Sequence, residues 1–192
     1  MSSIDDAKRM LRKHYISARK DFDNVQRTIK DIAIAENINK LLGMINVCGV
    51  VGYDSDGSEP DLFEVMEGVR KQGRQIAAPR YNSVAETYEP VLVGNWDEDF
   101  VEARYGLMEP KMELPTAPVA ANWVWLVPAV AFDGQGRRLG RGGGYYDRML
   151  SKYPGKRIGV CYQCQFSSSD LPGTEHDQKL DWVVTEEKVY NF

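Results

Sequence analysis

The residues best suited to chemistry lie in one glycine- and arginine-rich segment, residues 137–148, called the Gly/Arg loop below. It reads RRLGRGGGYYDR, and four of five consecutive positions from 140 to 144 are glycine. Glycine adopts positive φ without strain, so successive backbone N–H groups can point at one anion. Arg138 and Arg141 add permanently charged guanidinium groups that match phosphate oxygens. A helix expected from Tyr145 adds the unpaired N–H groups of its first turn, so the loop predicts a phosphate site.

Asp147 changes the kind of phosphate site that this loop predicts. A carboxylate repels a phosphate unless a cation lies between them, and Mg²⁺ typically takes one or two carboxylates together with substrate phosphates. The sequence therefore favours a loop that binds a metal–nucleotide phosphate. It matches neither the dinucleotide-binding glycine pattern nor the P-loop pattern. A glycine-rich surface turn with solvated arginines is the alternative interpretation.

Two other segments carry charges in positions that suggest binding. Lys8 and Arg12 lie four residues apart in a helix expected over residues 2–20, so they share one face and could grip one phosphate chain, although most such pairs only solvate a surface. An acidic loop, residues 53–61, follows an apolar strand expected over residues 46–52. Ligands gather beyond the carboxyl ends of such strands, although a plain turn before a capped helix explains the same residues.

The expected elements alternate between strands and helices, which predicts a three-layer α/β fold with a mainly parallel sheet flanked by helices and a single domain over residues 1–192. Helices are expected over residues 2–20, 24–42, 62–71 and 145–153, and strands over residues 46–52, 75–78, 86–93, 123–130, 157–162 and 182–185. Cys48 is expected in the core. The apolar residues of the second helix are expected to pack on the sheet; they are Val25, Ile29, Ile32, Ile38, Leu41 and Leu42.

Composition limits the classes of function. The chain has 192 residues and a net charge of −4, which argues against a general nucleic-acid binder. No apolar run is long enough to span a membrane and the first residues are charged, so we expect a cytoplasmic protein without a membrane partner. Three cysteines do not suggest a disulfide framework. Cys161 and Cys164 have C-x-x-C spacing without a second pair, and coincidence is the favoured explanation over a redox or zinc motif.

A family resemblance enters at the Gly/Arg loop. Residues 127–133, Gly136 and residues 138–147 resemble the signature of the 5-formyltetrahydrofolate cyclo-ligase family, and the resemblance extends from Lys8 to Glu186. It implies an ATP- and Mg²⁺-dependent closure of 5-formyltetrahydrofolate, with or without a polyglutamate tail, to 5,10-methenyltetrahydrofolate. ADP and phosphate are released, through a phosphorylated formyl (iminophosphate) intermediate. A monomer or weak homo-oligomer is expected.

The resemblance also implies roles for individual residues. Arg141 and Tyr145 are the expected catalytic residues, and Asp147 with Asp177 is expected to bind Mg²⁺. The residues expected to bind ATP are Lys8, Arg9, Met10, Leu11, Arg12, Arg138, Leu139, Gly140, Arg141, Gly142, Gly143, Gly144, Tyr145 and Tyr146. Those expected to bind the folate are Tyr53, Glu59, Asp61, Tyr105, Arg141, Gly142, Gly143, Gly144 and Tyr145.

Two positions depart from the family pattern. Leu62 stands where the family usually has threonine, and Ala129 where it usually has glycine. They keep open a non-catalytic paralogue that binds reduced folate or a nucleotide. A sugar-phosphate isomerase or CoA-transferase-like enzyme on a similar architecture is the other alternative, and it leaves the Lys8/Arg12 helix without a role.

Overall fold

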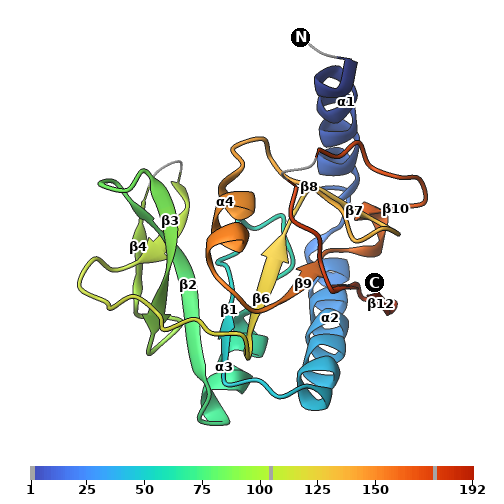
Figure 1. The fold of residues 1–192 in the computed structure, drawn as a ribbon. Helices are drawn as coiled ribbons and strands as arrows, with labels where there is room; N and C mark the ends of the chain where they lie inside the picture. Colours follow the sequence, from blue (N-terminus) through green and yellow to red (C-terminus); the bar gives the residue numbers. More distant parts are fainter. Residues whose placement is uncertain (1–2, 104–105, 175–176) are drawn as a thin grey trace.

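The fold is organised around a seven-stranded sheet (Figure 1). The computed structural model describes residues 3–103, 106–174 and 177–192. The strand order is β12 (Val189–Asn191), β11 (Trp182–Val184), β9 (Lys156–Val160), β6 (Trp123–Pro128), β1 (Gly49–Val51), β2 (Gln75–Asn82) and β3 (Thr87–Val93). The five inner strands are parallel and the two edge strands antiparallel, as the alternation of elements predicted.

Helices cover both faces of this sheet, which confirms the three-layer α/β prediction. On one face, α2 (Asn24–Met44) and α3 (Phe63–Lys71) bury Ile38, Leu42 and Met66 against strand residues such as Val50 and Leu126. On the other face, Met149 and Leu150 of α4 (Tyr145–Lys152) pack among Val51, Trp125 and Val127. Both faces of β1 and β6 are therefore apolar, as expected for strands buried inside a parallel sheet.

The connections that follow β1 and β6 lead to opposite sides of the sheet, so a topological switch point lies between these two strands. From β1 the chain passes through α3 to β2, on one side of β1. From β6 it passes through α4 to β9, on the opposite side. Connections that leave in opposite directions open a crevice at the carboxyl ends of the two strands, and ligands bind there in open α/β sheets.

Two smaller sheets complete the fold. One contains β7 (Ala131–Asp133), β8 (Arg138–Leu139) and β10 (Phe166–Ser167), and the other contains β4 (Phe100–Glu102) and β5 (Met108–Pro110). Leu11 and Tyr15 of α1 (Ser3–Ala18) pack against Ala131 and Leu139 of the first small sheet. In Figure 1, α1 accordingly stands beside β7 and β8. This packing fixes the Lys8/Arg12 helix next to the Gly/Arg loop.

Two buried polar side chains hold the segment that leads into the Gly/Arg loop. Asp133 accepts hydrogen bonds from the backbone N–H groups of Gln135, Arg137 and Leu171 at 2.8–2.9 Å. Gln165 donates from Nε2 to the carbonyls of Ala129 and Val130, both at 3.0 Å. Each buried group is satisfied by backbone partners, so each fixes a turn that the sequence alone did not assign.

Several expectations about single elements were wrong. Cys48 is exposed, because β1 begins one residue later, at Gly49. Val25, Ile29 and Ile32 are exposed, because only the second half of α2 lies on the sheet. The strand expected over residues 75–78 runs on to Asn82, because it pairs with β3 along its whole length. The strand expected over residues 123–130 ends at Pro128, and β7 begins after it, at Ala131.

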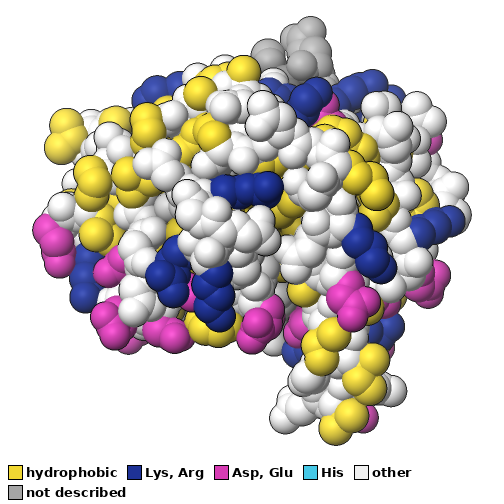
Figure 2. Space-filling model, turned by 90° about the horizontal axis from the view of Figure 1, so that it is seen from below, with side chains coloured by type: hydrophobic (Ala, Val, Ile, Leu, Met, Phe, Trp, Pro, Cys, Tyr) yellow, Lys and Arg dark blue, Asp and Glu magenta, His cyan; other side chains and the backbone are white. Residues whose placement is uncertain are grey.

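The surface outside the sheet carries mixed charges. On the face in Figure 2, Lys and Arg side chains are interspersed with Asp and Glu side chains and form no single extended basic field. Among the described helices, none is both long enough and apolar enough to cross a membrane.

We expect Gly159→Ala to lower the free energy of unfolding by about 2 kcal/mol, because overpacking a filled core typically costs this much. A Cβ at this position in β9 would lie 2.5 Å from a ring carbon of Phe132 and 2.8 Å from Leu180 Cδ1. Gly68→Ala is the matched control. Nothing lies within 4 Å of its Cβ position on α3, so it should stabilise by about 0.5–1 kcal/mol. Urea unfolding measures both, and a neutral Gly159→Ala would show that β9 and β7 pack loosely.

Candidate active site

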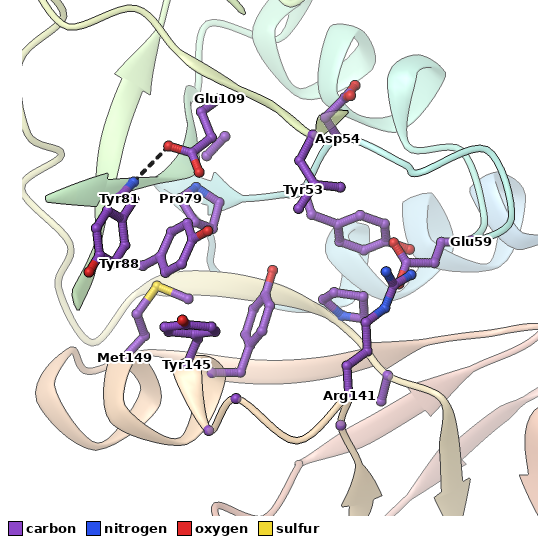
Figure 3. Close-up of a pocket in the computed structure, with 18 of the residues that line it drawn as sticks. Tyr53, Asp54, Glu59, Pro79, Tyr81, Tyr88, Glu109, Arg141, Tyr145 and Met149 are labelled. Atoms are coloured by element: carbon purple, nitrogen blue, oxygen red, sulfur yellow. Dashed lines mark hydrogen bonds and ion pairs between the residues drawn. The ribbon is translucent and has the colours of Figure 1, made fainter. Parts of the chain in front are cut away.

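A cavity of about 410 Å³ lies at the carboxyl ends of β1 and β6 (Figure 3). Tyr53 and Asp54 enter it directly after β1, and Pro128 and Ala129 enter it at the end of β6. Other lining residues come from β2, β3, β5 and the Gly/Arg loop; they include Pro79, Tyr81, Tyr88, Glu109, Arg138, Gly140, Arg141, Gly143, Gly144, Tyr145, Tyr146 and Asp147. The cavity therefore lies at the topological switch point, where the fold predicts a ligand site.

The Gly/Arg loop has the backbone conformation that its glycines predicted. Gly142 and Gly144 have φ values of +108° and +64°, and Gly144 caps the N-terminus of α4. At Gly143 a Cβ would lie 2.6 Å from the ring of Tyr145. No larger residue fits at these positions without moving the loop, so the exposed backbone N–H groups depend on glycine.

Cations from α1 converge on this loop. Arg12 Nε donates to the Gly140 carbonyl at 2.8 Å, and its guanidinium group lies 3.6 Å from the Cβ position of Gly142. Lys8, one turn earlier, forms an ion pair of 3.4 Å with Asp177. Lys8 and Arg12 of α1 thus lie beside the Gly/Arg loop, although 128 residues separate Arg12 from Gly140. Together they provide a concentrated positive charge over an open backbone.

The two expected metal ligands lie beside each other at the edge of this positive region. Asp147 Oδ1 accepts from the backbone N–H of Gln178 at 3.0 Å and from the buried Arg138 guanidinium at 2.5 Å. Asp177, the residue before Gln178, accepts from the backbone N–H of Thr174 at 2.8 Å. Burial opposes ionisation of Asp177, but the Thr174 hydrogen bond and the charge of Lys8 outweigh it and lower its pKa.

This pair fits Mg²⁺ better than a metal held by protein ligands alone. Among the described residues, no three His, Cys, Asp or Glu side chains are grouped as a metal cluster. Two ionised carboxylates next to a phosphate-binding backbone are what Mg²⁺ uses when it keeps waters and shares substrate phosphates.

A second charged cluster links Arg141 to the acidic loop after β1. Arg141 Nη2 donates to Glu59 Oε1 at 3.0 Å and to Asp56 Oδ2. Arg19, at the end of α1, lies beneath both acids with only 2% of its side chain exposed, 3.5 Å from Asp56 and 3.6 Å from Glu59. Burial would raise the pKa of Asp56, but hydrogen bonds from Arg141 and Ser58 lower it to about 2. Burial and the charge of Asp56 raise the pKa of Glu59.

Neither Arg19 nor Asp56 was among the expected site residues. Asp56 stands in the acidic loop, where four acids lie close together in the sequence and no spacing rule separates them. Arg19 is one of several basic residues on α1, and only its burial distinguishes it. A charged residue that follows the last turn of an amphipathic helix gives no signal of burial.

Tyrosine side chains form the wall of the cavity between these charged regions. The Tyr88 ring lies edge-on to those of Tyr81 and Tyr145, with centroids 5.4 and 5.0 Å apart. Burial raises the pKa of Tyr53 and of Tyr146, so both phenols stay protonated and can donate hydrogen bonds. Aromatic faces with hydroxyl groups at their rims suit a flat, polar-edged ring.

The structure does not bring every expected residue to the cavity. Asp61 accepts from the Phe63 N–H at 2.8 Å, just before α3, and it lines a smaller neighbouring pocket instead. Met10 is 73% exposed and Arg9 pairs with Asp6 on the solvent side of α1, because a helix turns 100° per residue away from Lys8 and Arg12. Leu11 packs in the core cluster at β7 and β8. Tyr105 lies outside the described residues.

Cys161 and Cys164 do not form a redox pair in this structure. Cys161 is fully buried after β9, and burial raises the pKa of its thiol well above the ordinary value. Cys164 is exposed and begins no helix that would stabilise a thiolate. Burial therefore favours a packing role for Cys161.

Comparison with known proteins shows which family this chain resembles. The sequence pattern of the 5-formyltetrahydrofolate cyclo-ligase family matches residues 4–186. The 5-formyltetrahydrofolate cyclo-ligase of Escherichia coli K12 is 31% identical over 147 residues, covering 74% of this chain and 80% of the relative. That of Mycolicibacterium smegmatis is 31% identical over 158 residues, covering 79% and 81%.

Solved structures agree in fold. The 5,10-methenyltetrahydrofolate synthetase of Aquifex aeolicus superposes with a TM-score of 0.81 at 28% identity, covering 96% of this chain and 92% of that one. A 5,10-methenyltetrahydrofolate synthetase from Mycoplasma pneumoniae gives 0.72 at 20% identity, covering 93% and 98%.

We expect Arg19→Met to lower the free energy of unfolding at pH 7 by roughly 2 kcal/mol, because it leaves two partly buried acids with one cation fewer. The pKa of Glu59, already raised in the folded protein, would rise further. A raised acid pKa favours folding below its unfolded value and disfavours it above, so the deficit should shrink from pH 7 to pH 4.5. Urea unfolding at both pH values measures this. Arg9→Met, on the exposed side of α1, is the control, and an equal deficit at both pH values would assign the loss to packing.

Proposed function

The chain belongs to the 5-formyltetrahydrofolate cyclo-ligase family, and we propose that it closes 5-formyltetrahydrofolate to 5,10-methenyltetrahydrofolate at the expense of ATP, with Mg²⁺, releasing ADP and phosphate. One observation supports the proposed dependence on ATP and Mg²⁺. Arg138, Arg141, Asp147 and glycines of the Gly/Arg loop line one end of the aromatic cavity, and Arg12 and the Lys8–Asp177 pair lie against the same loop. A triphosphate with a divalent cation needs such cations, an open glycine backbone and a carboxylate pair.

The proposed reaction takes place in two steps. The formyl oxygen attacks the γ-phosphorus of ATP; an O–P bond forms, the bond to the β-phosphate oxygen breaks, and ADP leaves. N10 then attacks the formyl carbon, the C–O bond breaks, phosphate carries the oxygen away, and the N10 proton goes to solvent. Such a sequence asks the protein mainly for positioning and for charge neutralisation.

The residues of this chain supply those two requirements. Lys8, Arg12 and Arg138 neutralise the nonbridging phosphate oxygens, and Arg141 faces the group in transfer. Backbone N–H groups of residues 142–144 are the proposed donors to that group, because positive φ at two of these glycines suits an anion-binding backbone. Asp147 and Asp177 would hold Mg²⁺, which would offset the negative charge that develops on the departing ADP. Tyr145 lies between this end and the aromatic wall, so its ring orients the folate.

The two departures from the family pattern are compatible with catalysis. Leu62 is 1% exposed in the core at the start of α3, away from the cavity lining. Ala129 contributes its carbonyl to Gln165, which a glycine would do equally. Neither removes a functional side chain from the cavity, so nothing in the site favours a binder without turnover.

Absorbance of methenyl-folate tests the proposal directly. Purified protein with 5-formyltetrahydrofolate, ATP and Mg²⁺ should give a rising signal that disappears when either ATP or the metal is omitted. A flat trace with folate binding still detectable by calorimetry would replace the proposal by the non-catalytic binder. No binding of folate at all would reject both.

Arg141→Ala should lower kcat by roughly 100-fold, as removal of one preorganised charge donor typically does. The melting temperature should fall only modestly, because the pairs with Asp56 and Glu59 that favour the ionised acids are half-exposed on the Arg141 side. Arg137→Ala, in the same loop and paired with the exposed Asp170 and the Leu171 carbonyl, is the control for a general loss of loop structure. Parallel losses of turnover and stability would make Arg141 a structural residue.

Asp177→Asn should raise the Mg²⁺ concentration for half-maximal activity roughly tenfold or more, because the amide removes one of two anionic ligands. Thermal shift with ATP and increasing Mg²⁺ measures the same weakening without turnover. Asp170→Asn, an exposed neighbour that pairs with Arg137, is the control. An unchanged Mg²⁺ requirement would exclude Asp177 from the metal site and leave it as the partner of Lys8.

A further inference from the structure

Glu109 of β5 is a buried carboxylate with one oxygen left open towards the cavity. Its side chain enters the cavity with the residue only 7% exposed. Oε2 accepts from the Tyr81 backbone N–H at 2.9 Å, whereas Oε1 has no hydrogen-bond partner in acceptable geometry among the described residues. Figure 3 shows Glu109 and Tyr81 at the end of the cavity opposite Arg141.

An unpaired oxygen of this kind implies a donor from a ligand. A buried carboxylate oxygen loses its hydration on folding, and without a partner that loss is uncompensated. The Tyr88 hydroxyl faces this carboxylate at the edge of hydrogen-bonding reach; burial, the charge of Glu109 and this contact raise the pKa of Tyr88. The carboxylate repels an anion at this end, so a phosphate or a glutamate tail is disfavoured there.

The side chains around Glu109 favour a flat ligand as the hydrogen-bond donor. Tyr81, Tyr88 and Tyr145 stand edge to face along one side, and Met108 and Met149 also line the cavity. Such walls accept a flat heterocycle whose rim carries N–H groups. In a reduced pterin, the 2-amino group and N3–H are adjacent donors on one edge, and a carboxylate accepts two such hydrogen bonds side by side.

We propose that Glu109 is the residue that recognises the 2-amino-4-oxopyrimidine edge of the pterin and thereby fixes the direction of the folate in the cavity. The inference rests on the proposed function, because the folate is the substrate that it orients. With the pyrimidine edge at Glu109, the formyl-bearing side of the ring faces the Gly/Arg loop. The Tyr81 N–H fixes the carboxylate by donating to Oε2. Oε1 then accepts from one ring donor, and the remaining lone pair of Oε2 accepts from the other.

Glu109→Gln is the variant that tests this role with the least change in shape. The amide oxygen can still accept from the Tyr81 N–H, but an NH₂ group replaces the open acceptor and opposes the ring donors. The KM for 5-formyltetrahydrofolate should rise roughly 10- to 100-fold, the effect of losing a charge-assisted hydrogen bond, while the KM for ATP changes less than about twofold. The melting temperature should not fall, because an unpaired buried charge is removed. Glu102→Gln, exposed on the strand paired with β5, is the matched control.

Binding of two small ring fragments provides a readout that does not need turnover. 6-Methylpterin carries the 2-amino donor, and 6-methyllumazine carries an oxygen in its place. Tyrosine and tryptophan fluorescence quenching should show that the wild-type protein prefers the pterin and that Glu109→Gln loses this preference. Tyr88→Phe should keep it, because that variant removes only the alternative polar group near the carboxylate.

The outcomes separate this inference from the proposed function. Methenyl product with an unchanged folate KM in Glu109→Gln, or a wild-type protein that does not distinguish the two fragments, would overturn the role of Glu109. Loss of preference in Tyr88→Phe but not in Glu109→Gln would overturn it as well. Absence of methenyl product, with the pterin preference intact and dependent on Glu109, would instead reject the ligase reaction and keep the recognition role.

Discussion

The site depends on one constraint of the sheet: the connections that leave β1 and β6 run in opposite directions. Adjacent parallel strands then have no crossover packed between their carboxyl ends, and a crevice opens there. Asp54 and Glu59 reach the cavity on the loop after β1, and Arg141 and Tyr145 reach it on the segment after β6. Each side of the cavity can thus vary in sequence without altering the sheet that holds the two sides together.

Charge is distributed unevenly along this cavity, and the unevenness gives it a direction. Guanidinium and ammonium groups gather where the Gly/Arg loop meets α1, whereas the open oxygen of Glu109 lies at the opposite end. In a cavity with apolar walls, such charges are weakly screened. Arg141 is meanwhile held by Asp56 and Glu59, so a phosphate that engages it must compete with two acids. An anionic ligand and a donor-rimmed ring are therefore directed to different ends.

Sequence reasoning could predict the parts of the site that depend on local spacing. Lys8 and Arg12 share a helix face, glycines permit positive φ at 142 and 144, and a continuous apolar run marks a buried parallel strand. It could not predict pairings between distant segments, such as Arg19 with Asp56 and Glu59, or the open oxygen of Glu109. The same limit explains the errors in α2. Its helical periodicity includes Val25 and Ile29, although the first half of the helix extends beyond the sheet and leaves both exposed. Periodicity identifies a face, but only tertiary packing decides how much of it is covered.

Glu59 and Asp61 show why the identity of a residue within a motif does not fix its role. Both are acids of one short loop, yet Asp61 lies two residues before Phe63 and its short side chain accepts from that N–H, as in an Asx turn. Glu59, with one more methylene and no backbone donor near, extends instead to Arg19 and Arg141. Burial and the charge of Asp56 raise the pKa of Glu59, whereas Arg141 and Arg19 favour its ionised form. A ligand that draws Arg141 away therefore makes Glu59 a stronger proton acceptor, which couples phosphate binding to the protonation of the acidic loop.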